Sequence, residues 1–397
     1  MMPISKNIST LMKNSSWIRA MFEEGEELKK KFGTDNVCDF SLGNPITEPP
    51  EALKNELIKV ASSDAQGMHR YMTNSGYDNV REEVAQYQRE ITGLPYTRDH
   101  IVMTVGAAGG LNVIFKSILD PGDEVIVPSP FFVEFMFYIG NHNGIIKLVD
   151  TKDDFHLDID KIKAAISRKT KAILINSPHN PTGVVYNEAE LLELADLLHE
   201  RSKKGQRIYI VADEAYKKII YNGIKLPNLP NMYEDTVNVT CHSKDLGLAG
   251  ERIGYIAISP RIKNVRSLID AAIFANRILG FINAPALMQR VVAKFQHNSV
   301  DIMEYQKKRD AIYNILVESG FEVIKPEGAF YIFPKSPIPD DIQFVKTMLQ
   351  HRILTVPGVG FGKSGYFRLA YCVTMDIIEK SRPHFKEVGE LLRKGQK

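Results

Sequence analysis

The chain has 397 residues, of which 44% are hydrophobic and 25% charged, as in an ordinary globular protein, and its length favours two domains. With 50 Lys and Arg against 48 Asp and Glu, the formal net charge is +2, so we expect no basic surface for nucleic acid or for an anionic membrane. The cysteines are scattered without zinc-site spacing and indicate a reducing compartment. Neither a signal peptide nor an apolar run of membrane-spanning length is visible, so the expected location is cytoplasmic.

From about residue 100, short apolar runs alternate with helical patterns. Residues 111–118 have apolar side chains at helical spacing, and Asn187 and Glu190 have the spacing of a capping box for a helix over 191–198. Strands are expected at 101–105, 124–127, 172–175, 208–212, 237–240 and 253–258. This alternation predicts an α/β domain with a mostly parallel sheet that helices cover on both faces.

The two ends of the chain have a different pattern. Residues 1–45 and 286–397 contain helical stretches and few strands, at 330–333 and 367–371. We therefore predict a large central domain over 46–285 and a smaller α/β domain formed by both chain ends.

Residues that can bind or react follow the ends of the predicted strands. A glycine-rich segment, 106–110, precedes a helix whose first N–H groups would favour a phosphate. The carboxyl ends of parallel strands meet at one edge of a sheet, so the side chains that follow them are expected to converge. These side chains would suit a ligand that has a phosphate, a basic ring nitrogen, a phenolic oxygen and an aldehyde. Pyridoxal 5′-phosphate has these four groups. The residues are Asn180, Asp213, Tyr216, Lys244 and Arg252.

A series of short motifs, in order and spacing, resembles the class I/II aminotransferases of the fold-type I pyridoxal-phosphate family. The resemblance covers nearly the whole chain. It implies a three-layer large domain, a homodimer with its sites at the interface, and ping-pong transfer of an amino group from an L-amino acid to a 2-oxo acid such as 2-oxoglutarate. The motifs are SLGNP (41–45), YMTNSGYDNVRE (71–82), TVGAAGGL (104–111), PSPFF (128–132), NSPHNPTG (176–183), ADEAY (212–216), SKDLGLAGERIGY (243–255), PEGAFY (326–331), PGVGFG (357–362) and FRLAY (367–371).

The resemblance also implies a role for each matching residue. Lys244 would hold the cofactor as a Schiff base and then move protons, and Asp213 would pair with the ring nitrogen. Arg368 would bind the substrate α-carboxylate, with Gly43 close by on the other side and Asn180 in contact. The other implied cofactor ligands are Asn180 and Tyr216 at the ring oxygen, Arg252 and the amides of Ala107 and Ala108 at the phosphate, Cys241 near it, Phe132 stacked on the ring, and Tyr71 reaching the phosphate of the neighbouring subunit.

Several of these residues could instead have a different role. Glu214 could take the place of Asp213, and Phe131 that of Phe132. Lys244 could be a solvated surface lysine, Arg368 could form a structural ion pair, and Gly43 could serve a turn.

Two positions depart from the family pattern. Cys241 stands where a serine usually donates to the phosphate, and a thiol is a weaker donor. Ala108 stands where the bacterial aspartate branch has a lysine for the distal carboxylate of the substrate. Arg19 and Arg277 remain as substitutes, and a neutral donor such as alanine or a larger apolar residue is at least as consistent with the sequence.

Two other functions are compatible with parts of the sequence. A pyridoxal-phosphate lyase or an aminocyclopropane-carboxylate-synthase-like enzyme would use the same cofactor, and the motif SKDLG suits that synthase branch too. A non-catalytic module fused to a DNA-binding regulator would need a helix-turn-helix domain, which the sequence does not show.

Overall fold

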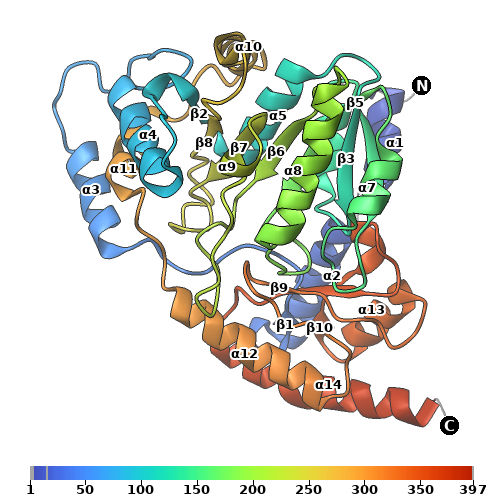
Figure 1. Ribbon diagram of the computed structural model, residues 1–397. Coiled ribbons are helices and arrows are strands. Elements are labelled where there is room, and N and C mark those ends of the chain that lie inside the picture. Colours follow the sequence, from blue (N-terminus) through green and yellow to red (C-terminus); the bar gives the residue numbers. More distant parts are fainter. Residues whose placement is uncertain (1–3, 15–16, 396–397) are drawn as a thin grey trace.

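The structure, a computed structural model, describes residues 4–14 and 17–395, and it describes the side chains of residues 4–12 and 23–391. Within the described residues, a seven-stranded sheet of order β2-β8-β7-β6-β5-β3-β4 forms the centre (Figure 1). Only β8 is antiparallel to its neighbours there, so the sheet is mostly parallel, as predicted. Its strands are β2 (Ile101–Thr104), β3 (Glu124–Ser129), β4 (Ile145–Asp150), β5 (Thr170–Asn176), β6 (Tyr209–Asp213), β7 (Thr236–Cys241) and β8 (Gly254–Ile258).

Helices cover both faces of this sheet because alternate strand residues are apolar on both sides. Ile173 and Ile175 face the layer of α8 (Glu188–Lys203), which lies across the near face in Figure 1. Leu174 faces the other layer, which contains α5 (Gly106–Ile118) and α10 (Val265–Ile278). The predicted three-layer α/β fold is confirmed.

Two local features show where sequence patterns worked and failed. The Asn187 side chain accepts the Glu190 N–H at 3.1 Å, and the Glu190 carboxylate accepts the Asn187 N–H at 2.6 Å, which confirms the capping box. The edge strand β4 was not predicted. Of its residues only Val149 is buried, so its pattern lacks the apolar run of the inner strands.

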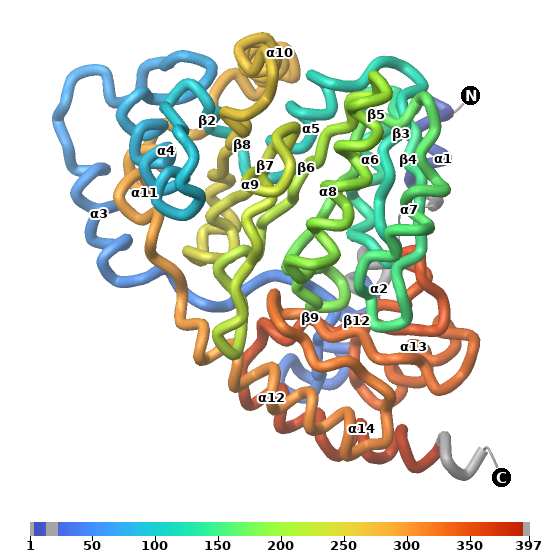
Figure 2. Tube along the Cα trace, viewed as in Figure 1, coloured from blue at the N-terminus to red at the C-terminus, as the bar shows by residue number. Residues whose placement is uncertain are grey.

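A smaller α/β domain lies below the central sheet in Figure 1 and combines α2 (Trp17–Phe32) and β1 (Cys38–Asp39), from near the N-terminus, with the C-terminal elements. In contrast, α1 (Lys6–Asn14) lies beside α7 (Ile159–Ala165) at the edge of the large sheet. Figure 2 shows the blue chain after α2 in the small domain, beside the orange and red C-terminal segments, while α1 lies higher, next to α7. β1 pairs in parallel with β10 (Ile353–Leu354), and β9 (Tyr331–Ile332), β12 (Phe367–Ala370) and β11 (Val356–Pro357) form a second small sheet. The main helices of the small domain are α2, α12 (Ile302–Glu318), α13 (Asp341–Gln350) and α14 (Met375–Gly395).

A third apolar cluster joins helices from distant parts of the sequence. It packs α3 (Glu51–Ala61) and α4 (Asp78–Thr92) against α11 (Ala286–Val292).

The domain boundaries at 45/46 and 285/286 stay predictions. The remaining elements are α6 (Glu134–Gly140), α9 (Leu229–Met232) and the 3₁₀ turns η1 (Thr34–Asn36), η2 (Arg98–His100), η3 (Ala293–Phe295) and η4 (Gly358–Phe361).

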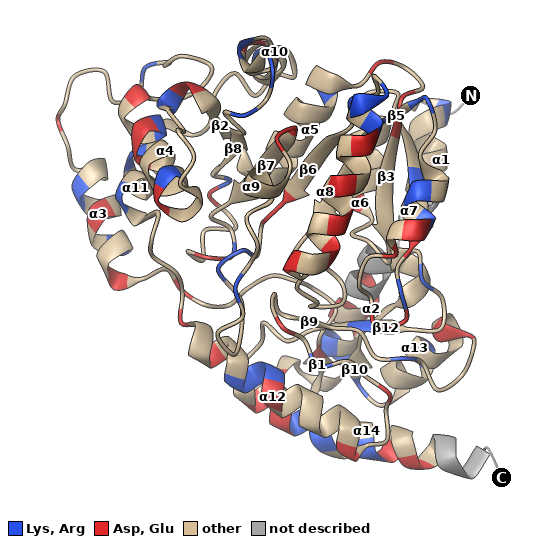
Figure 3. Ribbon diagram, viewed as in Figure 1, with Lys and Arg blue, Asp and Glu red and all other residues tan. Residues whose placement is uncertain are grey.

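Charged side chains of both signs are distributed over the fold. Figure 3 shows Lys and Arg interleaved with Asp and Glu along α12 and α14. Across the described residues, no helix combines the length and the apolar character needed to cross a membrane.

Candidate active site

A cavity of about 280 Å³ lies at the carboxyl ends of the parallel strands. Asn176, Asp213 and Cys241 are the last residues of β5, β6 and β7, and all three line it. The first turn of α5 closes the same edge, and the small domain contributes Gly43, Tyr331 and Arg368. The topology therefore gathers the side chains that the sequence separates.

Lys244 lies in the loop after β7 and points into the cavity. Its Nζ donates a hydrogen bond to the Gly43 carbonyl at 2.8 Å and lies 5.4 Å from the centre of the Phe330 ring. Among the described residues it forms no ion pair. Burial lowers the pKa of Lys244 below its usual range, which favours the neutral amine that a nucleophile requires.

The end of β6 and the loop after β7 form one wall of the cavity. Asp213 and Glu214 are neighbours in sequence that face opposite sides of this wall. Asp213 lines the cavity and accepts one hydrogen bond, from the Ala215 N–H at 3.2 Å. Burial raises the pKa of Asp213 to about 7, because few dipoles stabilise its charge. Glu214 instead accepts a hydrogen bond from the Asn238 side chain, away from the cavity. Of the two carboxylates, Asp213 can meet a ligand.

The N-terminus of α5 provides an anion-binding end. No side chain caps this helix, and no acidic residue occupies its first turn. Ala107 and Ala108 line the cavity there with Arg252. Gly106 has φ +67°, and a Cβ on it would lie 2.9 Å from Nη2 of Arg252, so glycine permits the close approach of the guanidinium. Arg252 itself has φ +52° and donates to the Ala249 carbonyl at 3.0 Å.

Arg368 is a second anion-binding group and is only 2% exposed. Its Nη1 donates to Asn180 Oδ1 at 3.1 Å and its Nη2 to the Ser41 carbonyl at 2.8 Å, while its buried Nε has no partner. Its guanidinium lies 4.7 Å from the ring centre of Tyr331 and 4.5 Å from that of Phe361. Within the described residues it forms no ion pair, so a purely structural role for Arg368 lacks an acidic partner. A carboxylate in the cavity would supply one.

The aromatic residues of the cavity form two groups. The Tyr216 and Tyr331 hydroxyl oxygens are 2.8 Å apart. Phe132 lines the cavity, packed edge-on against Phe135 with ring centres 5.5 Å apart, whereas Phe131 is buried in the core. Phe132 is therefore the phenylalanine that a ring in the cavity would contact.

Two predicted residues, Tyr71 and Arg277, lie away from the cavity of the single chain. Tyr71 is 86% exposed, and Arg277 is exposed on α10 with its guanidinium over Phe274. The side chain of Arg19 lies outside the described part of the chain. The proposed role of Tyr71 requires a second subunit and stays a prediction.

Among the cavity-lining residues that sequence reasoning missed, four have polar side chains: Tyr138, Asn176, Ser243 and Tyr331. Tyr331 ends the PEGAFY motif and Ser243 begins SKDLG, so both carried a signal from their motifs. Tyr138 lies in α6 beyond the quoted motifs and carried none.

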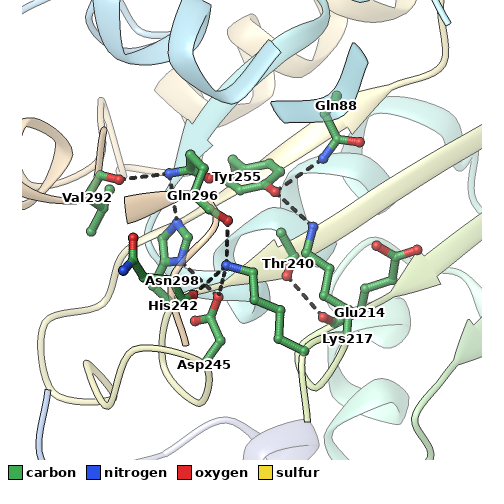
Figure 4. A network of polar contacts seen from close by, with 11 residues as sticks. Gln88, Glu214, Lys217, Thr240, His242, Asp245, Tyr255, Val292, Gln296 and Asn298 are labelled. Atoms are coloured by element: carbon green, nitrogen blue, oxygen red, sulfur yellow. Dashed lines mark hydrogen bonds and ion pairs between the residues drawn. The ribbon is translucent and has the colours of Figure 1, made fainter. Parts of the chain in front are cut away.

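A charged network occupies the opposite side of the same wall (Figure 4). Lys218 Nζ lies 3.1 Å from Asp245 Oδ2 and donates to the carbonyls of Gln296 and Asn298. His242 Nδ1 is 3.3 Å from the same carboxylate oxygen. Burial alone would raise the pKa of Asp245, but attraction to His242 and Lys218 outweighs it and holds the pKa at about 2. The ion pair ties the segment after β6 to the loop that contains Lys244.

These residues fit pyridoxal 5′-phosphate. The helix N-terminus with Arg252 matches the phosphate, a buried acid matches a ring nitrogen, and a half-buried lysine with a lowered pKa matches an aldehyde. The orphaned Nε of Arg368 leaves a carboxylate site for the substrate. All three cysteines are free and buried, and among the described side chains no group of three or more His, Cys, Asp or Glu could hold a metal ion.

Comparisons with known proteins identify the family of the chain. The sequence model for aminotransferases of class I and II matches residues 35–381. A probable aspartate aminotransferase of Methanocaldococcus jannaschii is 33% identical over 367 residues, which cover 90% of this chain and 94% of that protein. The crystal structure of an amino transferase from Eubacterium rectale has a TM-score of 0.95 and 33% identity, covering 98% and 99% of the two chains.

The aspartate aminotransferase of Thermus thermophilus, solved with maleate, has a TM-score of 0.87 and 27% identity and covers 98% of this chain and 100% of that one. These relatives are named as aminotransferases, and they do not favour a lyase. The chain belongs to the class I and II aminotransferases, and it is a pyridoxal-phosphate-dependent transaminase.

Proposed function

We propose that this transaminase moves the amino group of an L-amino acid to 2-oxoglutarate by a ping-pong mechanism. The observation that carries the proposal is Arg368, a buried guanidinium at the cavity with one N–H unpartnered and, among the described residues, no acidic partner. Donor and acceptor both have a carboxylate next to the reacting carbon, so one clamp can serve both. A cavity of about 280 Å³ suits one substrate at a time, which favours a substituted-enzyme cycle.

The side chains have separate tasks in this proposal. Bound pyridoxal phosphate supplies an electron sink for the bond broken at the substrate Cα. Lys244 holds the cofactor covalently and, once released, carries the proton to and from Cα, with the Gly43 carbonyl as its hydrogen-bond partner. Asp213 binds the protonated ring nitrogen, Tyr216 and Asn180 bind the ring oxygen, and Phe132 packs on the ring. Arg252, the amides of Ala107 and Ala108, and Cys241 hold the phosphate.

We also propose a homodimer in which Tyr71 reaches the phosphate of the partner. Its ring is 86% exposed, as expected for a side chain that a second copy covers. Phe274 and Ile278 on α10 are exposed apolar residues as well. Sedimentation should give twice the mass of the chain, and Tyr71→Phe should weaken cofactor binding without changing that mass. A monomer that is fully active would contradict this assignment.

The cations that line the cavity limit which amino-donor side chains can bind there. The cations that line the cavity among the described side chains are Lys244, Arg252 and Arg368, and each already has a task. A second carboxylate would then be desolvated without a partner from these residues. Ala108 lies where the bacterial aspartate branch has a lysine. We therefore propose that a neutral donor is used at least as well as aspartate, although the Methanocaldococcus jannaschii relative is named for aspartate.

Comparing kcat/KM for aspartate and alanine at fixed 2-oxoglutarate tests this point. A preference for aspartate of about 100-fold, or about 2.7 kcal/mol, would mean that a further cation reads the distal carboxylate. The variants Arg19→Ala and Arg277→Ala would then show which arginine binds that carboxylate, because only the loss of the binding arginine should remove the preference. Arg277 is exposed on α10, where a second subunit can contact it.

The reaction itself is tested by an amino-acid panel followed through the cofactor absorbance. Each good donor should convert the bound cofactor to its amine form, and 2-oxoglutarate should convert it back with release of glutamate. Release of ammonia with pyruvate in the absence of an acceptor would instead identify a lyase.

A further inference from the structure

Tyr331 contacts Tyr216 and Arg368 through different parts of one side chain. It lies on β9 of the small domain, is 3% exposed and lines the cavity. Its hydroxyl oxygen is 2.8 Å from that of Tyr216, and the Arg368 guanidinium lies 4.7 Å from the centre of its ring. It therefore connects the phenol proposed for the cofactor with the guanidinium proposed for the substrate.

The segment around Gly43 leaves room for the Tyr331 side chain. A Cβ on Gly43 would lie 2.1 Å from the Tyr331 hydroxyl oxygen and 2.9 Å from its Cζ, so a larger residue at 43 would displace the ring. Tyr331 also packs edge-on against Tyr216, with ring centres 5.6 Å apart. Its position is thus fixed on several sides.

Two hydroxyl groups that share one hydrogen bond have two protons to distribute. If Tyr216 donates its proton into the cavity, its oxygen is free to accept from Tyr331, and a donor that itself accepts a hydrogen bond is polarised and donates more strongly. If Tyr216 donates to Tyr331 instead, it has no proton left for a ligand. The Tyr331 hydroxyl has no other hydrogen-bond partner among the described residues, so its own proton is available for Tyr216.

Arg368 favours the first arrangement. Burial raises the pKa of Tyr331 to about 12, and the guanidinium on its ring acts in the opposite direction. A positive charge held against the ring makes its hydroxyl a better donor. Burial raises the pKa of Tyr216 well above its usual value, and Tyr331 itself adds to that rise, so Tyr216 is the weaker acid and the natural acceptor of the pair.

We propose that Tyr331 is a positioning residue with two functions: its hydroxyl orients the Tyr216 proton toward the cofactor, and its ring holds the Arg368 guanidinium in place for the substrate carboxylate. The proposal rests on the proposed function but is measured without turnover. The two functions can be separated because phenylalanine removes the hydroxyl and keeps the ring.

The first test is the pH titration of the absorbance of the lysine-linked cofactor. A hydrogen-bond donor to the ring oxygen lowers the proton affinity of the conjugated linkage, so weakening it should raise the pH midpoint. Tyr331→Phe should raise the midpoint by about half to one pH unit, as for one ordinary hydrogen bond. Tyr216→Phe should raise it at least as far, and the double variant should add little, because both act through one hydrogen bond.

The second test is the Kd of propionate, a carboxylate without an amino group, measured by ligand-observed NMR on the holoenzyme. Tyr331→Phe should leave it unchanged. Tyr331→Leu, or Tyr331→Met if the leucine variant does not fold, should weaken propionate about threefold to tenfold through loss of the cation–π contact.

The chain offers a matched control in a second pair of buried tyrosines. The Tyr371 hydroxyl donates to that of Tyr221 at 3.3 Å, and neither residue lines the cavity. Tyr371→Phe should lower the melting temperature without changing the pH midpoint or the propionate Kd.

Each outcome decides one part. A Tyr331→Phe midpoint equal to that of the wild type overturns the orienting function, and an unchanged propionate Kd in Tyr331→Leu overturns the function of the ring. If Tyr371→Phe changed the pH midpoint and the propionate Kd as much as the Tyr331 variants do, both effects would reflect general packing and both functions would be refuted. A wild-type enzyme that binds the cofactor but transfers no amino group would refute the proposed function alone, because both readings remain measurable.

Discussion

The chain at and beyond the carboxyl ends of β6 and β7 presents some side chains to the cavity and others to the opposite side of the cavity wall. On the cavity side, Asp213 is buried and Lys244 half-buried, and neither forms an ion pair with the described residues. On the other side, Lys218 and Asp245 form an ion pair at 3.1 Å, and His242 contacts the same carboxylate oxygen. The pKa values differ accordingly. Burial raises that of Asp213 to about 7, whereas paired Asp245 stays at about 2 although it is buried as well.

This difference separates a binding site from a structural network by physical criteria. A buried charge without a partner is unfavourable unless a ligand supplies one, whereas a paired charge holds the backbone in place. The network therefore stabilises the wall on which Asp213 and Lys244 are mounted. Substitutions of neighbouring residues on the two sides should have effects of different kinds.

The largest contrast is expected between two lysines. Lys244→Ala should bind the cofactor only non-covalently and lose turnover by at least about a thousandfold, because the nucleophile is gone. Lys217, whose Nζ donates to the Tyr255 hydroxyl at 2.9 Å behind the wall, provides the control. Borohydride reduction followed by mass spectrometry should find the cofactor on Lys244 in the wild type and in Lys217→Met. Attachment at another lysine would show that Lys244 is wrongly assigned.

The next contrast is between two adjacent carboxylates. Asp213→Ala should retain cofactor but lose about 3–5 kcal/mol of transition-state stabilisation, because the ring nitrogen loses its buried partner. Glu214→Gln keeps a hydrogen-bonding side chain beside Asn238 and should stay within a few-fold of the wild-type kcat/KM. Steady-state kinetics at saturating cofactor decides between them. An Asp213→Ala enzyme nearly as fast as the wild type would refute the assignment.

The paired side should respond in stability. Asp245→Asn leaves the Lys218 ammonium without its carboxylate, and breaking a buried pair costs about 3–5 kcal/mol in the free energy of unfolding. Adding Lys218→Met should recover part of that loss, because the unpaired charge is then removed. Denaturant unfolding of the holoenzyme measures both. Full additivity of the two substitutions would show that the ion pair does not couple them.

A smaller effect should appear in the pH dependence of the cofactor-free protein. Asp213 releases its proton near pH 3.8 when unfolded and near pH 7 when folded. The folded state thus holds a proton that the unfolded state has lost, so the contribution is complete below pH 3.8 and disappears as the pH rises to about 7. The melting temperature should fall over this interval by roughly a few degrees more in the wild type than in Asp213→Asn. Parallel curves would mean that the carboxylate is not buried in the absence of cofactor.

The smallest expected effect concerns a thiol at the cavity. Cys241→Ser replaces a weak donor by a hydroxyl, which should tighten cofactor binding about threefold to tenfold. Cys372→Ser is the control, since Cys372 is buried with its Sγ 3.6 Å from the Leu42 carbonyl and does not line the cavity. Titration of both apoenzymes with pyridoxal phosphate gives the two Kd values. Equal values for Cys241→Ser and the wild type would place the thiol away from the phosphate.

The sequence predicted the parallel core of the sheet because its strands are apolar on both faces. It did not predict β4, an edge strand with Ile145 half exposed, since partial burial leaves no clear apolar run. Motif spacing brought Lys244, Asp213 and Arg368 into the candidate set, but the choice between Asp213 and Glu214 needed the direction of each side chain. That direction depends on strand register.

The residues behind the wall could not be recognised from sequence. Lys218 and Asp245 are far apart along the chain, and each resembles an ordinary surface charge in its own segment. Their pairing depends on two parallel strands and on the carbonyls near residue 296, so only the tertiary fold reveals it. The partnership of Tyr331 with Tyr216 has the same origin, because it joins two domains.

The small domain joins β1, from near the N-terminus, to C-terminal strands, and this has a consequence for synthesis on the ribosome. Every strand of the central sheet lies between residues 101 and 258, so that sheet can pair while the remainder is still being translated. At that stage Lys244 and Asp213 have emerged, but Arg368 has not, and β1 still lacks its partner β10. A nascent chain can thus present the groups proposed to hold the cofactor before it has the guanidinium proposed to recognise a substrate.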